Sequence, residues 1–280
     1  MAEVTLDQVR GTYKARDSWW TVLLVDPLAG RLVRLLAGRT WLTPTRLTVA
    51  AFGLGVAAAG AFLRAGPAWL VAGAVLYYVS FAVDCVDGKI ARLREERSVV
   101  GSWLDFVLDR IRVVLCTLAL FAGQFLATGR EVFLFAALVV VFLSLFGYVN
   151  GAEIDKARRL MDAHGAAAPA PGRHRGEVAL PAVVAGVRDA LHRRRIRMNL
   201  VSGIEFEMAL FVVAPLLAAG LGPGAIVGVV VVAGALLVGF ELALMARFWV
   251  AAHAFDHLAA RSPAPAQRPR AESDGTRISR

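Results

Sequence analysis

The sequence predicts an all-α integral membrane protein with six transmembrane helices plus an N-terminal interfacial amphipathic helix. Hydrophobic residues make up 58% of its 280 residues and charged residues only 19%, whereas soluble domains average about 45–50% and about 25%. Six apolar runs approach the roughly 20 residues that a helix needs to cross a bilayer. The formal net charge is nevertheless +9, and basic loops at one membrane face reconcile such a charge with so apolar a chain. No soluble basic domain is evident, so we expect no nucleic-acid partner.

Residues 1–40 are expected to form a cytoplasmic N-terminal region. It does not resemble a signal peptide, because no short apolar run follows the start and charges recur from Glu3 to Asp26. Its segment Ser18–Ala37 combines a Trp pair with Leu, Val and Arg, which is typical of a helix lying in the membrane interface. A helix packed on the bundle is the alternative. Pro27 is expected in the first turn of this helix or at a kink.

The six predicted spans lie within a membrane domain of residues 41–250. They are Leu42–Leu63, Ala68–Val86, Trp103–Ala127, Val132–Val149, Phe206–Leu221 and Ala225–Val250. Cys85 and Cys116 lie in apolar runs, and we expect both to be buried free thiols rather than a disulfide.

The loops indicate the orientation. Basic residues gather before the first span, between spans two and three, and in a long connection of about residues 151–202, whereas the three opposite connections carry only Arg64 and Arg130. This bias places both termini in the cytoplasm. The basic stretch Ala190–Met198 either attracts anionic lipid headgroups or only sets this topology. We expect His164–Gly176 to be a flexible loop and residues 251–280 to be a disordered cytoplasmic tail.

Four acids stand out at the facing ends of spans two and three. The pattern is D-x-x-D-G-x-x-A-R, then eight residues, then G-x-x-x-D-x-x-x-D. It comprises Asp84, Asp87, Gly88, Ala91, Arg92, Gly101, Asp105 and Asp109. The first two acids are three residues apart and the last two are four apart, so each pair shares a helix face. The connection is short, so all four carboxylates are expected to converge at the cytoplasmic end of the spans, where acids are rare and usually functional.

Divalent cations are the expected counter-ions of this cluster. Carboxylate oxygens favour Mg²⁺, Mn²⁺ or Ca²⁺ over zinc. Four carboxylates suit two ions about 3.5–4 Å apart, an arrangement used in phosphoryl transfer. Gly88 would let the backbone approach a ligand, and Arg92 offers a fork that matches phosphate oxygens. The alternative is that the acids only pair with neighbouring Lys and Arg side chains.

These residues match the signature of the CDP-alcohol phosphotransferase (CDP-alcohol phosphatidyltransferase) family, which the chain therefore resembles. The resemblance implies a transferase of phospholipid biosynthesis, often a homodimer, that moves a substituted phosphate from a CDP-linked donor to an alcohol and releases CMP. It implies that two Mg²⁺ ions bind Asp84, Asp87, Asp105 and Asp109, and that Asp109 is the general base. Gly88, Arg92 and Ser98 would contact the CDP part. Pro44 and Thr48 of the segment PTRLT match a second family pattern near the nucleotide, in which Thr45 replaces the usual Asn.

The resemblance also bears on the substrates. It favours CDP-diacylglycerol as donor, a small alcohol or alcohol phosphate as acceptor, and a bacterial cell membrane with the active site facing the cytoplasm. A CDP-aminoalcohol or CDP-inositol donor is the alternative within the family. Arg110 and Arg112 are candidate acceptor-binding residues, although Arg112, one turn beyond Asp109, could instead pair with a nearby acid. The segment Tyr148–Glu153 lacks the basic residues that would favour inositol phosphate.

Three further acids, Glu205, Glu207 and Glu241, could line an acceptor pocket or pair between helices. Outside the family, a Mg²⁺-dependent membrane prenyltransferase also uses Asp-rich motifs, but the D-G-x-x-A-R core and the short spacing argue against it. A cation transporter would place its acids near the middle of the bilayer, whereas these acids lie at the ends of the spans. The sequence does not identify the acceptor alcohol.

Overall fold

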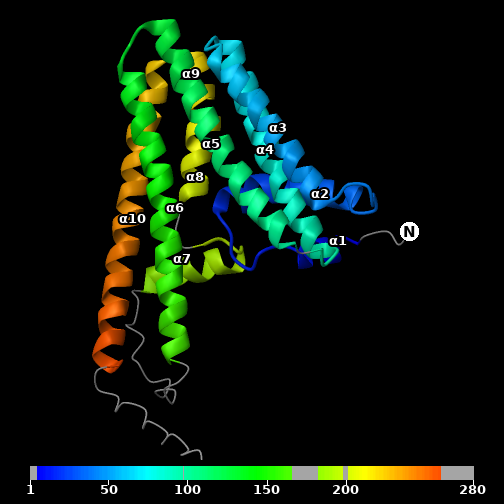
Figure 1. Ribbon diagram of the computed structural model, residues 1–280, viewed down its shortest axis with the longest axis vertical. Coiled ribbons are helices and arrows are strands. Elements are labelled where there is room, and N and C mark those ends of the chain that lie inside the picture. The colour runs from blue at the N-terminus through cyan, green and yellow to red at the C-terminus, as the bar shows by residue number, and fades with distance from the viewer. Residues whose placement is uncertain (1–4, 97, 166–181, 198–200, 260–280) are drawn as a thin grey trace, which may run out of the picture.

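The computed structural model describes residues 5–96, 98–165, 182–197 and 201–259, and within these ranges it contains helices and no β-strand. Six long apolar segments confirm the predicted all-α membrane fold (Figure 1). They are α3 (Pro44–Leu63), α4 (Pro67–Leu93), α5 (Val99–Thr128), α6 (Val132–Gly165), the composite helix of α8, η2 and α9 (Gly203–Leu221) and α10 (Gly224–Ala259).

Local sequence signals fix the helix ends around the later site. The Thr43 hydroxyl accepts a hydrogen bond from the Arg46 amide at 3.3 Å and begins α3, with Pro44 in the first turn. The Ser98 hydroxyl does the same for the Gly101 amide at 3.2 Å and begins α5. These two caps place the starts of α3 and α5 beside the end of α4.

Helices α6 and α10 continue well beyond the predicted ends of their spans. They contain 34 and 36 residues, about 50 Å each at 1.5 Å per residue, against about 30 Å of hydrocarbon. Figure 1 shows the two side by side and reaching past the lower end of α5. Hydropathy falls after Val149, but pairs such as Lys156–Glu153, 3.5 Å apart, keep a helical spacing. Helix α6 ends at Gly165 and α10 at Ala259, so each extends into the predicted loop (His164–Gly176) or tail (residues 251–280). Residues 166–176 and 260–280 of those predictions lie outside the described residues.

The fifth span is a broken helix. It consists of α8 (Gly203–Met208), the wider π-helical turn η2 (Ala209–Val213) and α9 (Ala214–Leu221). Pro215 stands in the first turn of α9 and has no amide hydrogen, so the regular ladder is interrupted one turn earlier. The span begins three residues before the predicted Phe206.

The N-terminal region packs on the bundle rather than lying free at its edge. It contains α1 (Leu6–Gly11), the π-helical turn η1 (Thr21–Val25) and α2 (Asp26–Leu36), with Pro27 in the first turn of α2. Helix α2 contacts α4, and Val25, Ala29 and Val33 are completely buried. A helix is thus present in the predicted segment, and its buried face matches the alternative of packing on the bundle. Its position at a membrane interface stays a prediction. Its other face exposes Leu28 and Leu35.

Close packing of α3, α4 and α5 holds the site. A Cβ atom added at Gly123 of α5 would lie 2.5 Å from the carbonyl oxygen of Phe62 in α3, so only glycine permits this approach. The Phe62 ring is completely buried. A further helix, α7 (Ala182–Arg193), precedes a short backbone bridge between Ile196 and Asp17, which joins the segment after α7 to the N-terminal region.

Candidate active site

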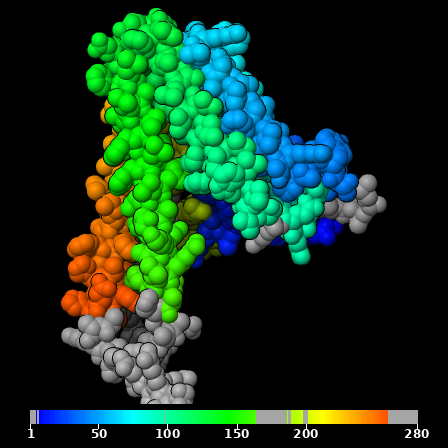
Figure 2. All heavy atoms as spheres, in the orientation of Figure 1, coloured from blue at the N-terminus to red at the C-terminus, as the bar shows by residue number. Residues whose placement is uncertain are grey.

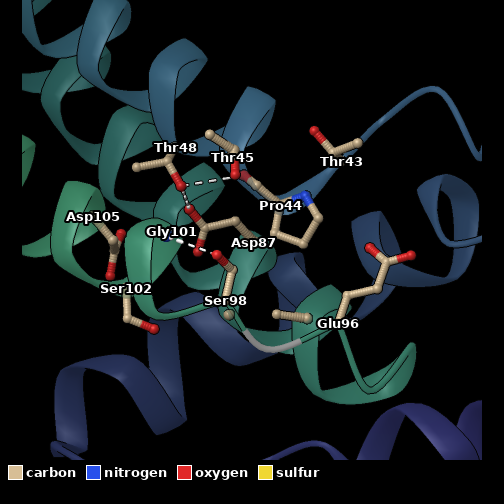
Figure 3. Close-up of a pocket in the computed structure, with 12 residues that line it drawn as sticks. Thr43, Pro44, Thr45, Thr48, Asp87, Glu96, Ser98, Gly101, Ser102 and Asp105 are labelled. Atoms are coloured by element: carbon tan, nitrogen blue, oxygen red, sulfur yellow. Dashed lines mark hydrogen bonds between the residues drawn. The ribbon is translucent and has the colours of Figure 1, made fainter.

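Three of the four predicted acids converge where α4 ends and α5 begins. Carboxylate oxygens of Asp84, Asp87 and Asp105 lie within 4.8 Å of one another. Asp87 is only 6% exposed, and its Oδ2 accepts a hydrogen bond from the Thr48 hydroxyl at 2.6 Å. The contact brings α3 into the cluster (Figure 3). The spacing therefore placed these acids correctly on two facing helix ends.

This cluster has the character of a cation site. The Oδ1 atom of Asp105 is buried and has no hydrogen-bond partner among the described residues. A buried carboxylate oxygen without a partner is costly, and three converging carboxylates repel one another. A divalent cation with a preference for oxygen ligands would satisfy both conditions. The residues present therefore fit a metal ion.

The fourth acid, Asp109, faces arginines instead. Its Oδ1 accepts a hydrogen bond from Arg112, and its Oδ2 accepts one from Arg110 at 3.2 Å. Arg112 is 2% exposed, lies 3.8 Å from an oxygen of Asp84 and donates to the Ser80 hydroxyl at 3.1 Å. Of the two roles considered for Arg112, pairing with nearby acids is the one present here. Metal ligation by Asp109 and acceptor binding by Arg112 stay predictions.

Arg110 links this cluster to the fifth and fourth spans. Its guanidinium lies 3.5 Å from a carboxylate oxygen of Glu207 in α8 and 3.4 Å from the ring centre of Tyr148 in α6. Glu207 is 5% exposed and also accepts hydrogen bonds from the hydroxyls of Tyr77 and Tyr148, at 3.4 and 3.3 Å. Interhelix pairing, one of the two predicted roles of Glu207, is thus observed.

A pocket of about 350 Å³ opens beside the acids (Figure 3). The starts of α3 and α5 and the end of α4 surround it. Its wall includes most of the residues predicted to bind the donor: Pro44, Thr48, Gly88 and Ser98, next to Asp87 and Asp105. Thr43, Thr45, Glu96 and Ser102 also line it and were not predicted.

Arg92 lies behind this wall rather than in it. Its Nε donates to the carbonyl oxygen of Thr12 at 2.7 Å. Its terminal nitrogens lie 3.5 and 3.9 Å from the position that a Cβ atom at Gly88 would occupy. Arg92 is therefore not among the residues that line the pocket, and donor binding by Arg92 stays a prediction.

The N-terminal region also holds the motif helix. Buried Lys89, next to Gly88, lies 3.1 Å from an Oδ atom of buried Asp26, whose other Oδ atom contacts Arg195 at 2.5 Å. The Tyr13 ring lies against both cations, 5.5 Å from Lys89 Nζ and 4.5 Å from Arg195. Burial, followed by the charge of Asp26, raises the pKa of Tyr13 above its ordinary value, so its hydroxyl stays protonated and donates to the Asp26 carbonyl. Three distant segments thus fix the end of α4.

Some of these contacts had a signal in the sequence and others had none. Tyr77, Ser80, Asp84 and Asp87 follow at spacings of three, four and three, so they share one face of α4, and that face could have been read from the sequence. The contacts of Asp26 and Glu207 join segments far apart in the chain and depend on the packing of the bundle.

Three comparisons relate this chain to known proteins. The model of the CDP-alcohol phosphatidyltransferase family matches residues 41–170. The archaetidylinositol phosphate synthase of Aeropyrum pernix is 36% identical over 111 residues, covering 38% of this chain and 55% of that protein. The protein of the same name from Methanothermobacter thermautotrophicus is 30% identical over 105 residues, covering 37% and 52%. The chain thus spans about half the length of the curated relatives it matches.

The fold also resembles that of a solved structure, the crystal structure of Mycobacterium tuberculosis phosphatidylinositol phosphate synthase with CDP-DAG bound. The TM-score is 0.53 at 17% sequence identity, and the match covers 81% of this chain and 94% of that one. The likeness shows a shared fold. The acids and the pocket lie on α3, α4 and α5, so the part of this chain that holds the candidate site is the part that matches the CDP-alcohol phosphatidyltransferase family model.

Proposed function

We propose that this protein is a membrane phosphotransferase that moves a substituted phosphate from a CDP-linked donor to an alcohol and releases CMP. The observation that carries the proposal is the convergence of Asp84, Asp87 and Asp105 beside a pocket of about 350 Å³. The unpartnered oxygen of Asp105 supports a cation at this point. The preferred donor is CDP-diacylglycerol, because a structural neighbour is described with CDP-DAG bound.

The chain's own residues account for donor binding. Gly88 has no side chain to obstruct the pocket, and Thr48 and Ser98 also line it. Asp84, Asp87 and Asp105, with Asp109 as the predicted fourth ligand, would hold two Mg²⁺ or Mn²⁺ ions. Such ions stabilise the charge on a transferring phosphate and its leaving group. The pocket opens at the ends of spans, where a lipid-linked donor can keep its acyl chains in the bilayer.

Asp109 is our candidate for the general base. It stands one turn beyond Asp105, and its two oxygens are held by Arg110 and Arg112. These contacts orient the carboxylate so that it can take the proton from the acceptor hydroxyl as that oxygen attacks the donor's β-phosphorus. The bond that forms joins the acceptor oxygen to this phosphorus. The bond that breaks joins the same phosphorus to the oxygen of the departing CMP.

The loop charges support the orientation proposed here, and the family resemblance supports the membrane and the assembly. We infer a cytoplasmic active site, with both termini on that side, in a bacterial cell membrane, and a homodimer as the assembly. CDP-aminoalcohol and CDP-inositol donors are the alternatives within the family.

Purified protein should release CMP from CDP-diacylglycerol in the presence of an alcohol and Mg²⁺, and excess chelator should abolish this release. Asp87→Asn should lower divalent-ion affinity, measured directly by calorimetry, while the protein still inserts in the membrane. Glu131→Gln, an exposed acid on the connection before α6, is the matched control and should change neither. Full CMP release in excess chelator would refute the metal-dependent mechanism.

A further inference from the structure

A second cavity, of about 140 Å³, lies between α6, α8 and α10. It is smaller than the roughly 300–1,000 Å³ of sites for drug-sized ligands, so it suits a small molecule. Its polar wall is formed by Ser144, Tyr148, Glu207 and Glu241. One guanidinium separates it from the reaction centre, because Arg110 contacts both Glu207 of this wall and Asp109.

The wall of this cavity has an excess of negative charge. Glu207 is balanced by Arg110 and by two tyrosine hydroxyls. Glu241 is 8% exposed, and its Oε2 accepts a 2.6 Å hydrogen bond from the side-chain amide of Asn150. No Lys, Arg or His side chain of the described residues lies within 4 Å of the Glu241 carboxylate. A buried carboxylate without a cation in a membrane span is expensive, and such residues usually serve a ligand.

One polar atom of the wall lacks a partner. The Ser144 hydroxyl is buried and makes no hydrogen bond within the described parts of the chain. This hydroxyl can donate or accept, whereas the Glu241 carboxylate only accepts and therefore favours a ligand that donates hydrogen bonds. A hydroxyl or ammonium group meets that need, whereas a phosphate brings only negative charge toward Glu241.

The nearest arginines do not offset the negative charge of this wall. The terminal nitrogens of Arg110 are shared between Asp109 and Glu207. Those of Arg112 are shared among Asp84, Asp109 and Ser80. A phosphate that bound the terminal nitrogens of either arginine would compete with these partners, whereas the Nε atoms of Arg110 and Arg112 have no hydrogen-bond partner among the described residues.

We propose that this cavity, whose role rests on the proposed function, binds the acceptor alcohol and selects one that presents only hydroxyl or ammonium groups, against phosphorylated alcohols. This assignment separates the protein from the curated relatives, whose names describe the synthesis of a lipid with a phosphorylated inositol headgroup.

The test compares matched acceptors on the wild-type enzyme. CMP release from CDP-diacylglycerol, CDP-ethanolamine and CDP-inositol is measured with glycerol against glycerol 3-phosphate and with inositol against inositol 1-phosphate, and ethanolamine supplies a cationic acceptor. We expect the higher kcat/KM for the unphosphorylated member of each pair. A preference for the phosphorylated members would overturn the inference and leave the proposed function standing. CMP from no combination would overturn both.

A variant then locates the selectivity in Glu241. Glu241→Gln should raise the KM of the preferred alcohol by about 10–100-fold, the loss expected for one charge-assisted hydrogen bond, while the KM of the donor stays within about twofold. It should also lower the preference for the unphosphorylated member of each pair. Asp256→Asn, at an exposed site on the same helix, should change neither value. An unchanged preference in a folded Glu241→Gln enzyme would overturn the assignment, and if this variant does not fold, the wild-type comparison decides.

Discussion

At the scale of single residues, the site is organised by pairs of charges that the membrane makes costly to separate. Arg112 is the clearest case, because its buried guanidinium lies between Asp84 and Asp109, two members of the motif. Breaking a buried pair by removing one partner leaves the other charge uncompensated and typically costs about 3–5 kcal/mol. Asp84 and Asp109 therefore depend on the guanidinium of Arg112 to balance their charge.

Arg112→Gln should for this reason lower the thermal unfolding midpoint of the detergent-solubilised protein by several degrees. Arg158→Gln is the control, since Arg158 is about half exposed and its pair with Asp155 is 3.8 Å long, and exposed pairs contribute about 0–1 kcal/mol. Equal midpoints for the two variants would contradict a structural role for the Arg112 contacts.

Asp109→Asn tests the general base. The change keeps the size of the side chain and one acceptor oxygen but removes the group that takes the proton. We expect donor affinity to stay within about tenfold, while turnover falls by about 10²–10⁴-fold. Donor Kd and kcat are measured on one preparation. Near-normal kcat would remove Asp109 as the base, and loss of donor binding together with turnover would make it chiefly a metal ligand.

At the scale of elements, close approach of α3, α4 and α5 places the acids and the pocket. Figure 3 shows residues of all three helices around one pocket. Their crossing depends on positions that admit no side chain, and Gly123 is the tightest of these against backbone. A shift of α5 away from α3 would move Asp105 and Asp109 relative to Thr48.

Gly123→Ala should therefore destabilise the protein, because overpacking typically costs about 1–3 kcal/mol. Gly60→Ala is the matched control, since a Cβ atom there would meet nothing within 4 Å, and alanine in a helix is favoured over glycine by about 1 kcal/mol. Thermal midpoints should move in opposite directions. A midpoint for Gly123→Ala at or above that of the wild type would show that α3 and α5 are not held at this spacing.

The sequence predicted elements better than their ends. Hydropathy located all six spans because burial in lipid requires long apolar runs. It could not show that α6 continues to Gly165 or that the fifth span is broken before Pro215, because helical spacing persists in polar segments and a π-helical turn leaves no compositional mark. Likewise, the spacing of Asp84 and Asp87 predicted that they share a helix face. The contact of Asn150 with Glu241 depends instead on how α6 and α10 pack.

At the scale of the whole molecule, the bundle has one end rich in basic residues and one end nearly free of them. Figure 2 shows the surface hollowed between α6 and the lower part of α5, with atoms of the N-terminal elements, in blue, visible there. The candidate site and the N-terminal region thus belong to the same end of the molecule. This end also carries the connection after α4 and the segment after α7.

Cysteine labelling can test the orientation of the bundle. In a chain with Cys85 and Cys116 replaced, single cysteines at positions 64 and 194, both exposed, should react with membrane-impermeant reagent from opposite sides. Position 194 should react only after the cytoplasmic face is opened. Labelling of both positions from one side would contradict the six-span arrangement.

The contact between Asp26 and Arg195 joins residues 169 positions apart, and this distance has a consequence for biogenesis. At about 5–20 residues per second, Arg195 leaves the ribosome roughly 10–30 seconds after Asp26. The first four spans are synthesised during that interval, and Lys89 and the end of α4 lack their contact with the Asp26–Arg195 pair until it ends. A nascent chain halted after the fourth span should therefore be inserted but catalytically immature, and the enzyme is completed only when its last third is synthesised.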